Sequence, residues 1–152
     1  MEILKQILMN RILISGLIGW AVAQVLKTII YLVVNHELNF ERLFGDGGMP
    51  SGHSATVTAV ALSTGFEVGF NTPIFALAAI VAIIVMHDAT GVRLETGKQA
   101  KAINDMMAFM QKLGGKELTN KEKLKEFVGH TPLQVVMGCI LGIVVAIVFH
   151  YA

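Results

Sequence analysis

Residues 12–34 read ILISGLIGWAVAQVLKTIIYLVV, and Lys27 carries the single charge among them. A helix needs about 20 mostly apolar residues to span a bilayer, so this run predicts a membrane-spanning helix. Two further runs, residues 72–86 and 131–151, are as apolar, and each has a proline near its start, where proline favours helix initiation. A fourth run, residues 54–66, has only 13 residues. We expect it to cross much of the membrane only if neighbouring helices shield it.

The composition of the whole chain also indicates a membrane protein. Of its 152 residues, 54% are hydrophobic and 15% are charged, whereas a typical soluble domain carries about 25% charged residues. A soluble globule of this size would need more charge on its surface. The same figures exclude a disordered chain, a disulfide scaffold and a nucleic-acid binder. We therefore expect an all-α polytopic membrane bundle of about four crossings, with the lipid bilayer as its partner and no nucleic acid.

A polar segment, residues 94–129, lies within the single membrane domain that we expect for residues 1–152. Eight of the twelve lysines and arginines lie between Arg93 and Lys125. Apolar side chains recur at helical spacing within it, which is typical of an amphipathic helix lying on a membrane surface. We therefore expect residues 94–129 to form an interfacial or cytosolic helical insertion. Its apolar side chains are Ile103, Met106, Met107, Met110 and Leu113.

The distribution of positive charge predicts an orientation in the membrane. With four crossings, residues 35–53 and 91–129 lie on one face and together hold nine lysines and arginines, whereas Lys5 and Arg11 lie on the other face. The positive-inside rule then places both long segments in the cytoplasm. We expect an integral protein of the plasma membrane, with both termini outside. A reversed topology is the open alternative.

The loop before residues 54–66 has the composition of an anion site. Residues 45–53 read GDGGMPSGH, and a helix that begins there presents N–H groups and a partial positive charge, which attract phosphate. Glycines such as Gly48 and Gly52 let the backbone approach an anion closely, and His53 can give or take a proton. The alternative interpretation is an N-capped helix that follows a flexible loop.

Other polar residues lie inside the membrane or at its boundary. Burying the Lys27 ammonium costs about 2.5–3.5 kcal/mol at the bilayer centre, so Lys27 must face a polar cavity or partner, or extend to the interface. Arg93 can clamp a phosphate with two hydrogen bonds, although an interfacial arginine is also ordinary topology. With four crossings, Lys27, His53 and Arg93 gather at one face with His130. This set suits phosphoryl transfer without a metal: one histidine attacks phosphorus and the other protonates the leaving oxygen.

Several of these residues resemble motifs of one superfamily. Pro50-Ser51-Gly52-His53 resembles the central motif of the type-2 phosphatidic acid phosphatases and the related vanadium haloperoxidases. Gly129-His130-Thr131-Pro132 and the glycine-containing helix after it resemble the histidine and helix of the third motif, and Arg93 resembles that motif's arginine. Lys27 resembles the lysine of the first motif, whose arginine is replaced by Val34. The chain as a whole resembles the small divergent branch of this superfamily.

The resemblance implies a metal-independent membrane phosphatase, which hydrolyses a lipid phosphate or diphosphate through a phosphohistidine intermediate. His130 would be the nucleophile and His53 the general acid, with Gln134 and Asp88 supporting them. No metal and no cofactor are expected. The residues expected to hold the substrate phosphate are Lys27, Ser51, Gly52 and Arg93.

The chain departs from the family pattern at the third motif. Arg93 and His130 are separated by 36 residues, whereas the family places them close together. Gln134 stands where the family has an acid; it can accept a hydrogen bond from His130 and fix the tautomer, but it brings no charge. Loss of that charge can lower the rate by orders of magnitude. Either Asp88 or Glu95 supplies a carboxylate through space, or the protein is slow, or it binds without catalysing.

Three alternatives stay open at this point. The first is a catalytically weak or inactive membrane protein that binds lipid phosphate as a scaffold, and the second is a small transporter that uses Lys27. The third is a metal site, but its three candidate histidines, His53, His87 and His130, lack the dense spacing of metal ligands. Gly138 and Gly142 form a small-xxx-small pair that is typical of close helix packing, with a homodimer contact as the other reading.

Overall fold

A computed structural model describes residues 2–37, 48–113, 124, 126 and 129–152 of the chain. This part of the chain is helical and has no strand. Three of its helical runs, residues 11–35, 73–112 and 132–151, are long and apolar enough to cross a membrane. The predicted all-α membrane bundle with about four crossings is thereby confirmed. Its helices are α1 (Glu2–Leu8), α2 (Arg11–Asn35), α3 (Gly52–Val68), α4 (Pro73–Thr90), α5 (Val92–Lys112) and α6 (Pro132–Tyr151).

The starts of the long helices follow from local sequence. Before each of α2, α3, α4 and α6, a short polar side chain accepts a hydrogen bond from a backbone N–H of the first turn. Such caps satisfy donors that the helix itself leaves without a partner. In α4 and α6 the cap is followed by a proline in the first turn. The capping residues are Asn10, Ser51, Thr72 and Thr131.

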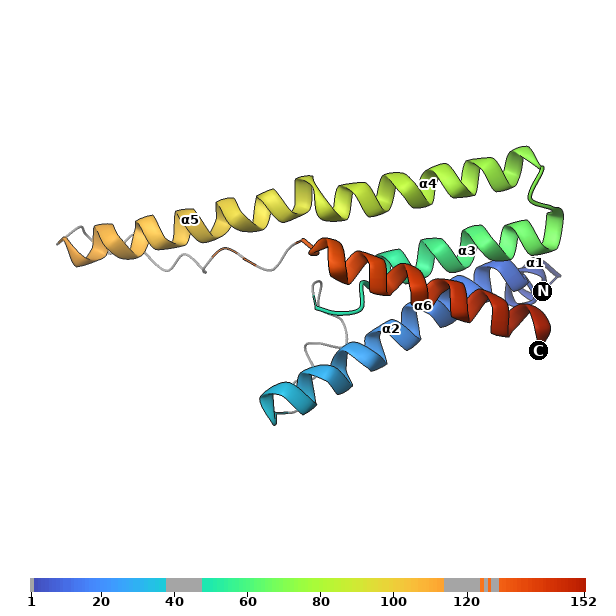
Figure 1. Ribbon diagram of the computed structural model, residues 1–152, viewed down its shortest axis with the longest axis horizontal. Helices are drawn as coiled ribbons and strands as arrows, with labels where there is room; N and C mark the ends of the chain where they lie inside the picture. The colour runs from blue at the N-terminus through green and yellow to red at the C-terminus, as the bar shows by residue number, and fades with distance from the viewer. Residues whose placement is uncertain (1, 38–47, 114–123, 125, 127–128) are drawn as a thin grey trace.

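The short helix α3 lies at the centre of the bundle, in contact with α2, α4 and α6 (Figure 1). It has 17 residues, which correspond to about 25 Å, somewhat less than the roughly 30 Å of a bilayer's hydrocarbon core. Nine of its residues are buried. The expectation that neighbouring helices shield this segment is confirmed.

Small residues bring α2 and α6 close to α3. A Cβ atom added at Gly142 of α6 would lie 2.6 Å from the carbonyl oxygen of Ala55, and one added at Gly19 of α2 would lie 3.2 Å from the same oxygen. Gly138 is equally tight, since a Cβ there would lie 2.9 Å from that of Ser54. The Gly138–Gly142 pair therefore serves close packing within the chain, as small residues often do between membrane helices.

The outer surface of the bundle is apolar. Large hydrophobic side chains of α4 are more than half exposed, a pattern that indicates a surface covered by lipid rather than by water. The protein is an integral membrane protein, with α4 as one of its lipid-facing helices. The exposed side chains of α4 include Ile74, Leu77, Ile80, Ile83 and Ile84.

One end of the bundle is held together by Arg11, at the start of α2. Its guanidinium donates to the carbonyl oxygen of Phe149 at 2.9 Å and lies 3.4 Å from the Glu67 carboxylate. Nearby, the rings of Phe66 and His150 stack with their centroids 4.5 Å apart. Both chain termini lie at this end (Figure 1), so the Gly52, Thr90 and Pro132 ends of α3, α4 and α6 lie at the other.

The amphipathic helix expected in residues 94–129 is α5. It continues from α4 in nearly the same direction and extends past the ends of α3 and α6 (Figure 1). A membrane-surface position for α5 stays a prediction, and it requires the helix to bend away from α4 at Gly91. The expected apolar side chains are mostly exposed: Ile103, Met106, Met110 and Leu113.

Leu124 and Glu126 contact the middle of α5. The Asn104 side chain donates to the Leu124 carbonyl oxygen at 3.0 Å and to the Glu126 carboxylate at 2.9 Å, and it accepts from the Leu124 N–H at 3.1 Å. These contacts join the middle of α5 to two residues that lie later in the sequence. The rest of the insertion, residues 114–123, 125 and 127–128, lies outside the described part of the chain.

Candidate active site

Three chain segments meet at the end of the bundle opposite Arg11. The Ser51 N–H, just before α3, donates to the carbonyl oxygen of Gln134 in α6 at 3.0 Å. The His130 N–H, just before α6, donates to the carbonyl oxygen of Ala89 in α4 at 3.0 Å. These two bonds tie the start of α3 and the end of α4 to the start of α6.

The imidazole of His130 is buried, with 3% of its surface exposed, and its tautomer follows from its neighbour. Oε1 of Gln134 accepts a hydrogen bond from the Thr131 N–H at 3.0 Å. Since a backbone N–H can only donate, the Gln134 atom must be the amide oxygen. His130 Nδ1 lies 3.3 Å from the same oxygen, and this contact is a hydrogen bond when Nδ1 carries the hydrogen. In a neutral ring with that tautomer, the lone pair lies on Nε2.

Thr131 holds Gln134 in place, a role that the sequence analysis missed. Its hydroxyl accepts from the Gln134 N–H while the Gln134 side chain accepts from the Thr131 N–H, which completes a capping box. The pattern Thr-x-x-Gln at a helix start was a readable signal for this arrangement. The same box that begins α6 thus orients the amide that contacts His130.

His53 lies beside His130. It is the second residue of α3 and is exposed. The two ring centroids are 6.0 Å apart, with 61° between the ring planes. The buried ring of His130 and the exposed ring of His53 therefore face one small region, although 76 positions separate them in the sequence.

The first turn of α3 presents backbone donors beside these rings. The N–H groups of Gly52 and His53 have no hydrogen-bond partner within the described part of the chain. The Ser51 hydroxyl is fully buried and accepts from the N–H and the hydroxyl of Ser54, at 3.3 and 3.0 Å. Ser51 thus fixes the start of the helix, while Gly52 and His53 supply donors that suit an anion. A phosphate contact by Ser51 itself stays a prediction.

Arg93 lies close to His130 in space. Gly129 packs against the backbone of Leu94, and a Cβ atom added at Gly129 would lie 2.6 Å from the carbonyl carbon of Arg93. The Arg93 Nε donates to the Asp88 carboxylate at 2.6 Å, across the junction of α4 and α5. Tertiary structure therefore brings the arginine to the turn that carries His130.

The two carboxylates considered as replacements for the family's acid each pair with a cation. Asp88 contacts Arg93, and the Glu95 carboxylate accepts from Lys98 at 2.7 Å. The side chain at Nδ1 of His130 is that of Gln134. Gln134 therefore supplies the hydrogen-bond acceptor for His130, and Asp88 supplies the carboxylate partner of Arg93.

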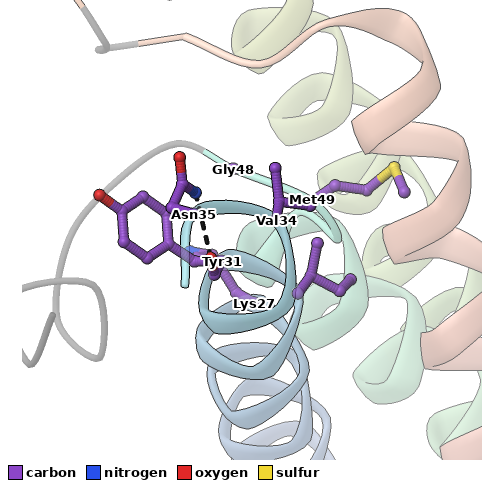
Figure 2. A pocket seen from close by; sticks show the side chains of 7 residues that line it. Lys27, Tyr31, Val34, Asn35, Gly48 and Met49 are labelled. Carbon is purple, nitrogen blue, oxygen red and sulfur yellow. Dashed lines mark hydrogen bonds between the residues drawn. The ribbon is translucent and has the colours of Figure 1, made fainter. Parts of the chain in front are cut away.

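Lys27 lies at a pocket between α2 and the chain before α3. It is 5% exposed. Gly48, with a φ of 88°, packs on its stem, since a Cβ there would lie 3.1 Å from Lys27 Cγ. Residues 45–47 of the glycine-rich loop lie outside the described part of the chain. Figure 2 shows the pocket, which has a volume of about 150 Å³ and is lined by Lys27, Ile30, Tyr31, Val34, Asn35, Gly48 and Met49.

A family model described as "Divergent PAP2 family" matches residues 8–145 of the chain. The chain belongs to the divergent PAP2 family. The match includes every candidate residue from Lys27 to Gln134. No solved structure matches the chain.

The chain is also similar to a bacterial membrane protein. The chain is 37% identical over 154 residues to the uncharacterized membrane protein YuiD of Bacillus subtilis (strain 168). The similarity covers 96% of this chain and 98% of the relative. Membrane residence is therefore a property that both chains share.

The histidines of this divergent PAP2 chain are its candidate metal ligands. Within the described residues, no three side chains of histidine, cysteine, aspartate or glutamate gather in a group that could hold a metal ion. His53 and His130 lie side by side, but no carboxylate or third histidine from the described residues joins them in such a group. Independence from metals stays a prediction for experiment.

Proposed function

We propose that this protein hydrolyses the phosphate ester of a membrane lipid through a phosphohistidine intermediate. The observation that carries the proposal is the orientation of His130. Gln134 holds the hydrogen on Nδ1, and the ring of His53 lies 6.0 Å away between centroids. A buried nucleophile with a fixed tautomer, next to an exposed proton donor, suits transfer of one phosphoryl group.

In the first step, His130 Nε2 attacks the phosphorus of the lipid phosphate. The bond from phosphorus to the lipid oxygen breaks as the bond from phosphorus to nitrogen forms. A protonated His53 gives its proton to the leaving oxygen, so the product is a neutral lipid alcohol. The developing positive charge on His130 is held by the Nδ1 hydrogen bond to Gln134.

In the second step, water attacks the phosphorus of phosphohistidine. His53, now neutral, takes a proton from that water. The bond from phosphorus to nitrogen breaks and returns the lone pair to Nε2 of His130. Inorganic phosphate leaves, and both histidines regain their starting protonation states.

Cations and backbone donors would hold the phosphoryl oxygens during both steps. The N–H groups of Gly52 and His53 lie in the first turn of α3. Arg93 lies beside the turn that carries His130. Lys27 approaches from α2, and Ser51 positions the first turn of α3. Fixed donors of this kind stabilise the charge of a phosphoryl transition state without reorganising.

A lipid is the substrate class that fits the surroundings. The site lies at one end of a bundle whose outer side chains are largely apolar. The alkyl chains of a lipid phosphate can therefore stay in the bilayer while the head group reaches the histidines. The positive-charge bias favours the cytoplasmic face of the plasma membrane for this end of the bundle.

The test is phosphate release by the purified protein from a panel of lipid phosphates and diphosphates, with EDTA present. We expect activity to persist in EDTA, because every group proposed to stabilise charge belongs to the protein. Complete loss in EDTA, restored by one divalent ion, would contradict a metal-independent reaction. Acid-labile phosphate on His130, trapped from labelled substrate and lost in His130→Ala, would identify the intermediate.

A second measurement separates the two histidines. His130→Ala should abolish turnover of every substrate. His53→Ala should reduce turnover strongly for a lipid alcohol and only slightly for nitrophenyl phosphate, since an acidic leaving group hardly needs a proton. Equal losses on both substrates would argue against His53 as the general acid.

A second candidate function is binding of lipid phosphate without cleavage. It is favoured by Gln134, which gives His130 a hydrogen-bond acceptor but no negative charge. Saturable binding of a lipid phosphate with no phosphate release from any substrate of the panel would select this function.

A further inference from the structure

We propose that the pocket beside Lys27 binds the first carbons of the substrate's alcohol, next to the phosphorus. This inference rests on the proposed function and adds the position of the organic part of the substrate. The resemblance assigns Lys27 to the phosphate, and the new element is a role for the apolar side chains that line the pocket beside it.

The pocket combines one cation with apolar walls. Lys27 lines the pocket together with Ile30, Val34 and Met49, which contribute apolar side chains. Figure 2 shows Val34 and Met49 along one side of the pocket, with Lys27 deeper along α2. A phosphate ester of an alkyl alcohol suits this combination of side chains. Its negative charge would lie near Lys27, and its first carbons would contact the apolar residues that line the pocket.

The volume restricts which part of a lipid can enter. The pocket has a volume of about 150 Å³. Pockets that enclose a whole drug-sized ligand measure about 300–1,000 Å³. The pocket therefore suits a short fragment next to the phosphate, and the remaining chain must lie outside it.

The pocket also offers a route for the remaining chain. It lies at the Asn35 end of α2, where Val33 and Val34 are 66% and 69% exposed. The Asn35 side chain donates to the Tyr31 carbonyl oxygen at 3.0 Å, which holds it against the helix (Figure 2). An alkyl chain that leaves the pocket past Val34 therefore enters the apolar surroundings of α2 directly.

The test fills the pocket and measures binding rather than turnover. The probe is a radiolabelled, non-hydrolysable phosphonate analogue of phosphatidic acid, bound to full-length protein in phosphatidylcholine vesicles. Val34→Trp should raise the Kd of this probe at least fivefold. Ile29→Trp is the matched control, because Ile29 lies on the same helix, is 49% exposed and does not line the pocket. It should bind the probe like the wild type.

A second ligand separates loss of the pocket from loss of the phosphate site. Inorganic phosphate should compete with the probe at an unchanged inhibition constant in Val34→Trp, because it has no carbons to place in the pocket. Equal Kd values for Val34→Trp and Ile29→Trp would overturn the proposal. A parallel rise in the inhibition constant of inorganic phosphate would also overturn it, since the substitution would then have displaced the phosphate site.

Two further arms complete the design. A polyprenyl phosphonate replaces the glycerol-based probe, and the probe whose Kd rises more in Val34→Trp identifies the alcohol that occupies the pocket.

If Val34→Trp does not fold, Ile30→Ala tests the same side of the pocket by enlarging it, and it should weaken binding of the preferred probe at least threefold. Binding that responds as expected without any turnover would refute the phosphatase but retain the pocket.

Discussion

Gly129 lies directly against the backbone of Leu94, so the two ends of the polar insertion meet. A side chain at Gly129 would collide with the Leu94 backbone and would lie 2.6 Å from the Arg93 carbonyl carbon. The next residue, His130, donates its N–H to the carbonyl oxygen of Ala89. The insertion therefore adds 36 residues between Arg93 and His130 without separating them in space.

Replacing Gly129 should disturb the site more than the fold. Gly129→Val forces the turn away from Leu94, and overpacking of this kind costs about 1–3 kcal/mol. Because His130 is the next residue, we expect at least a tenfold loss of phosphate release with only a modest drop in Tm. Ala102→Val, on an exposed position of α5, is the control and should retain activity. Full activity in Gly129→Val would show that the closed turn is unnecessary.

Gln134→Glu should raise turnover. A carboxylate keeps the acceptor for the Thr131 N–H and for His130 Nδ1 and adds the charge that balances an imidazolium. We expect an increase of about tenfold in kcat, which corresponds to roughly 1.4 kcal/mol in the barrier. If neither Gln134→Glu nor Gln134→Leu changes turnover of a substrate that the wild type cleaves, His130 is not the nucleophile.

Thr131→Ala separates helix capping from support of His130. Losing an N-cap side chain costs about 1 kcal/mol of stability, and the backbone N–H of Thr131 still donates to Gln134. We expect a lower Tm with kcat reduced less than threefold. A loss of kcat as large as that of Gln134→Leu would mean that the capping box as a whole orients the nucleophile.

Asp88→Asn tests what the Arg93 ion pair contributes. Both side chains are about half exposed, at 47% for Arg93 and 41% for Asp88, and such pairs add only about 0–1 kcal/mol to stability. We expect an unchanged Tm and a KM raised severalfold, because Asp88 holds the guanidinium that we propose to bind the phosphate. A selective fall in kcat would instead assign Asp88 the charge that Gln134 lacks.

Gln24→Met should stabilise the protein. Gln24 is 8% exposed, and its Oε1 has no hydrogen-bond partner in the described part of the chain. An unsatisfied buried acceptor costs about 1–3 kcal/mol, and methionine has a similar length without the amide. Thermal unfolding in detergent should shift to higher temperature. A lower Tm would show that the buried amide stabilises the protein.

The orientation of the chain can be read at Lys112, an exposed residue at the end of α5. Lys112→Cys in a Cys139→Ala background removes the natural thiol and adds one beyond the candidate site. If the positive-inside rule holds, an impermeant thiol reagent should label it only after the cells are broken. Ready labelling in intact cells would place the candidate site on the outer face.

Much of the architecture was readable from composition and local pattern. Three apolar runs were long enough to span a bilayer, and polar caps with first-turn prolines marked where two of them begin. These signals are local, because helix formation and membrane insertion depend on neighbouring residues. The residues expected at the site were likewise named from motifs, with Lys27, His53, Arg93 and His130 placed at one end of the bundle. Their chemical roles remain predictions.

Other features depended on contacts between residues far apart in the chain. Only packing shows that α3 is shielded on several sides, that Gly129 returns to Leu94, and that Asp88 binds Arg93. Assigning a tautomer to His130 depends on the relative positions of three groups: its Nδ1, the Gln134 amide oxygen and the Thr131 N–H. The pocket beside Lys27 forms where Gly48 packs against the aliphatic part of the Lys27 side chain. The number of residues between two positions does not determine their distance in space. The two ends of a long segment can meet, or they can lie far apart, whatever the length of the segment.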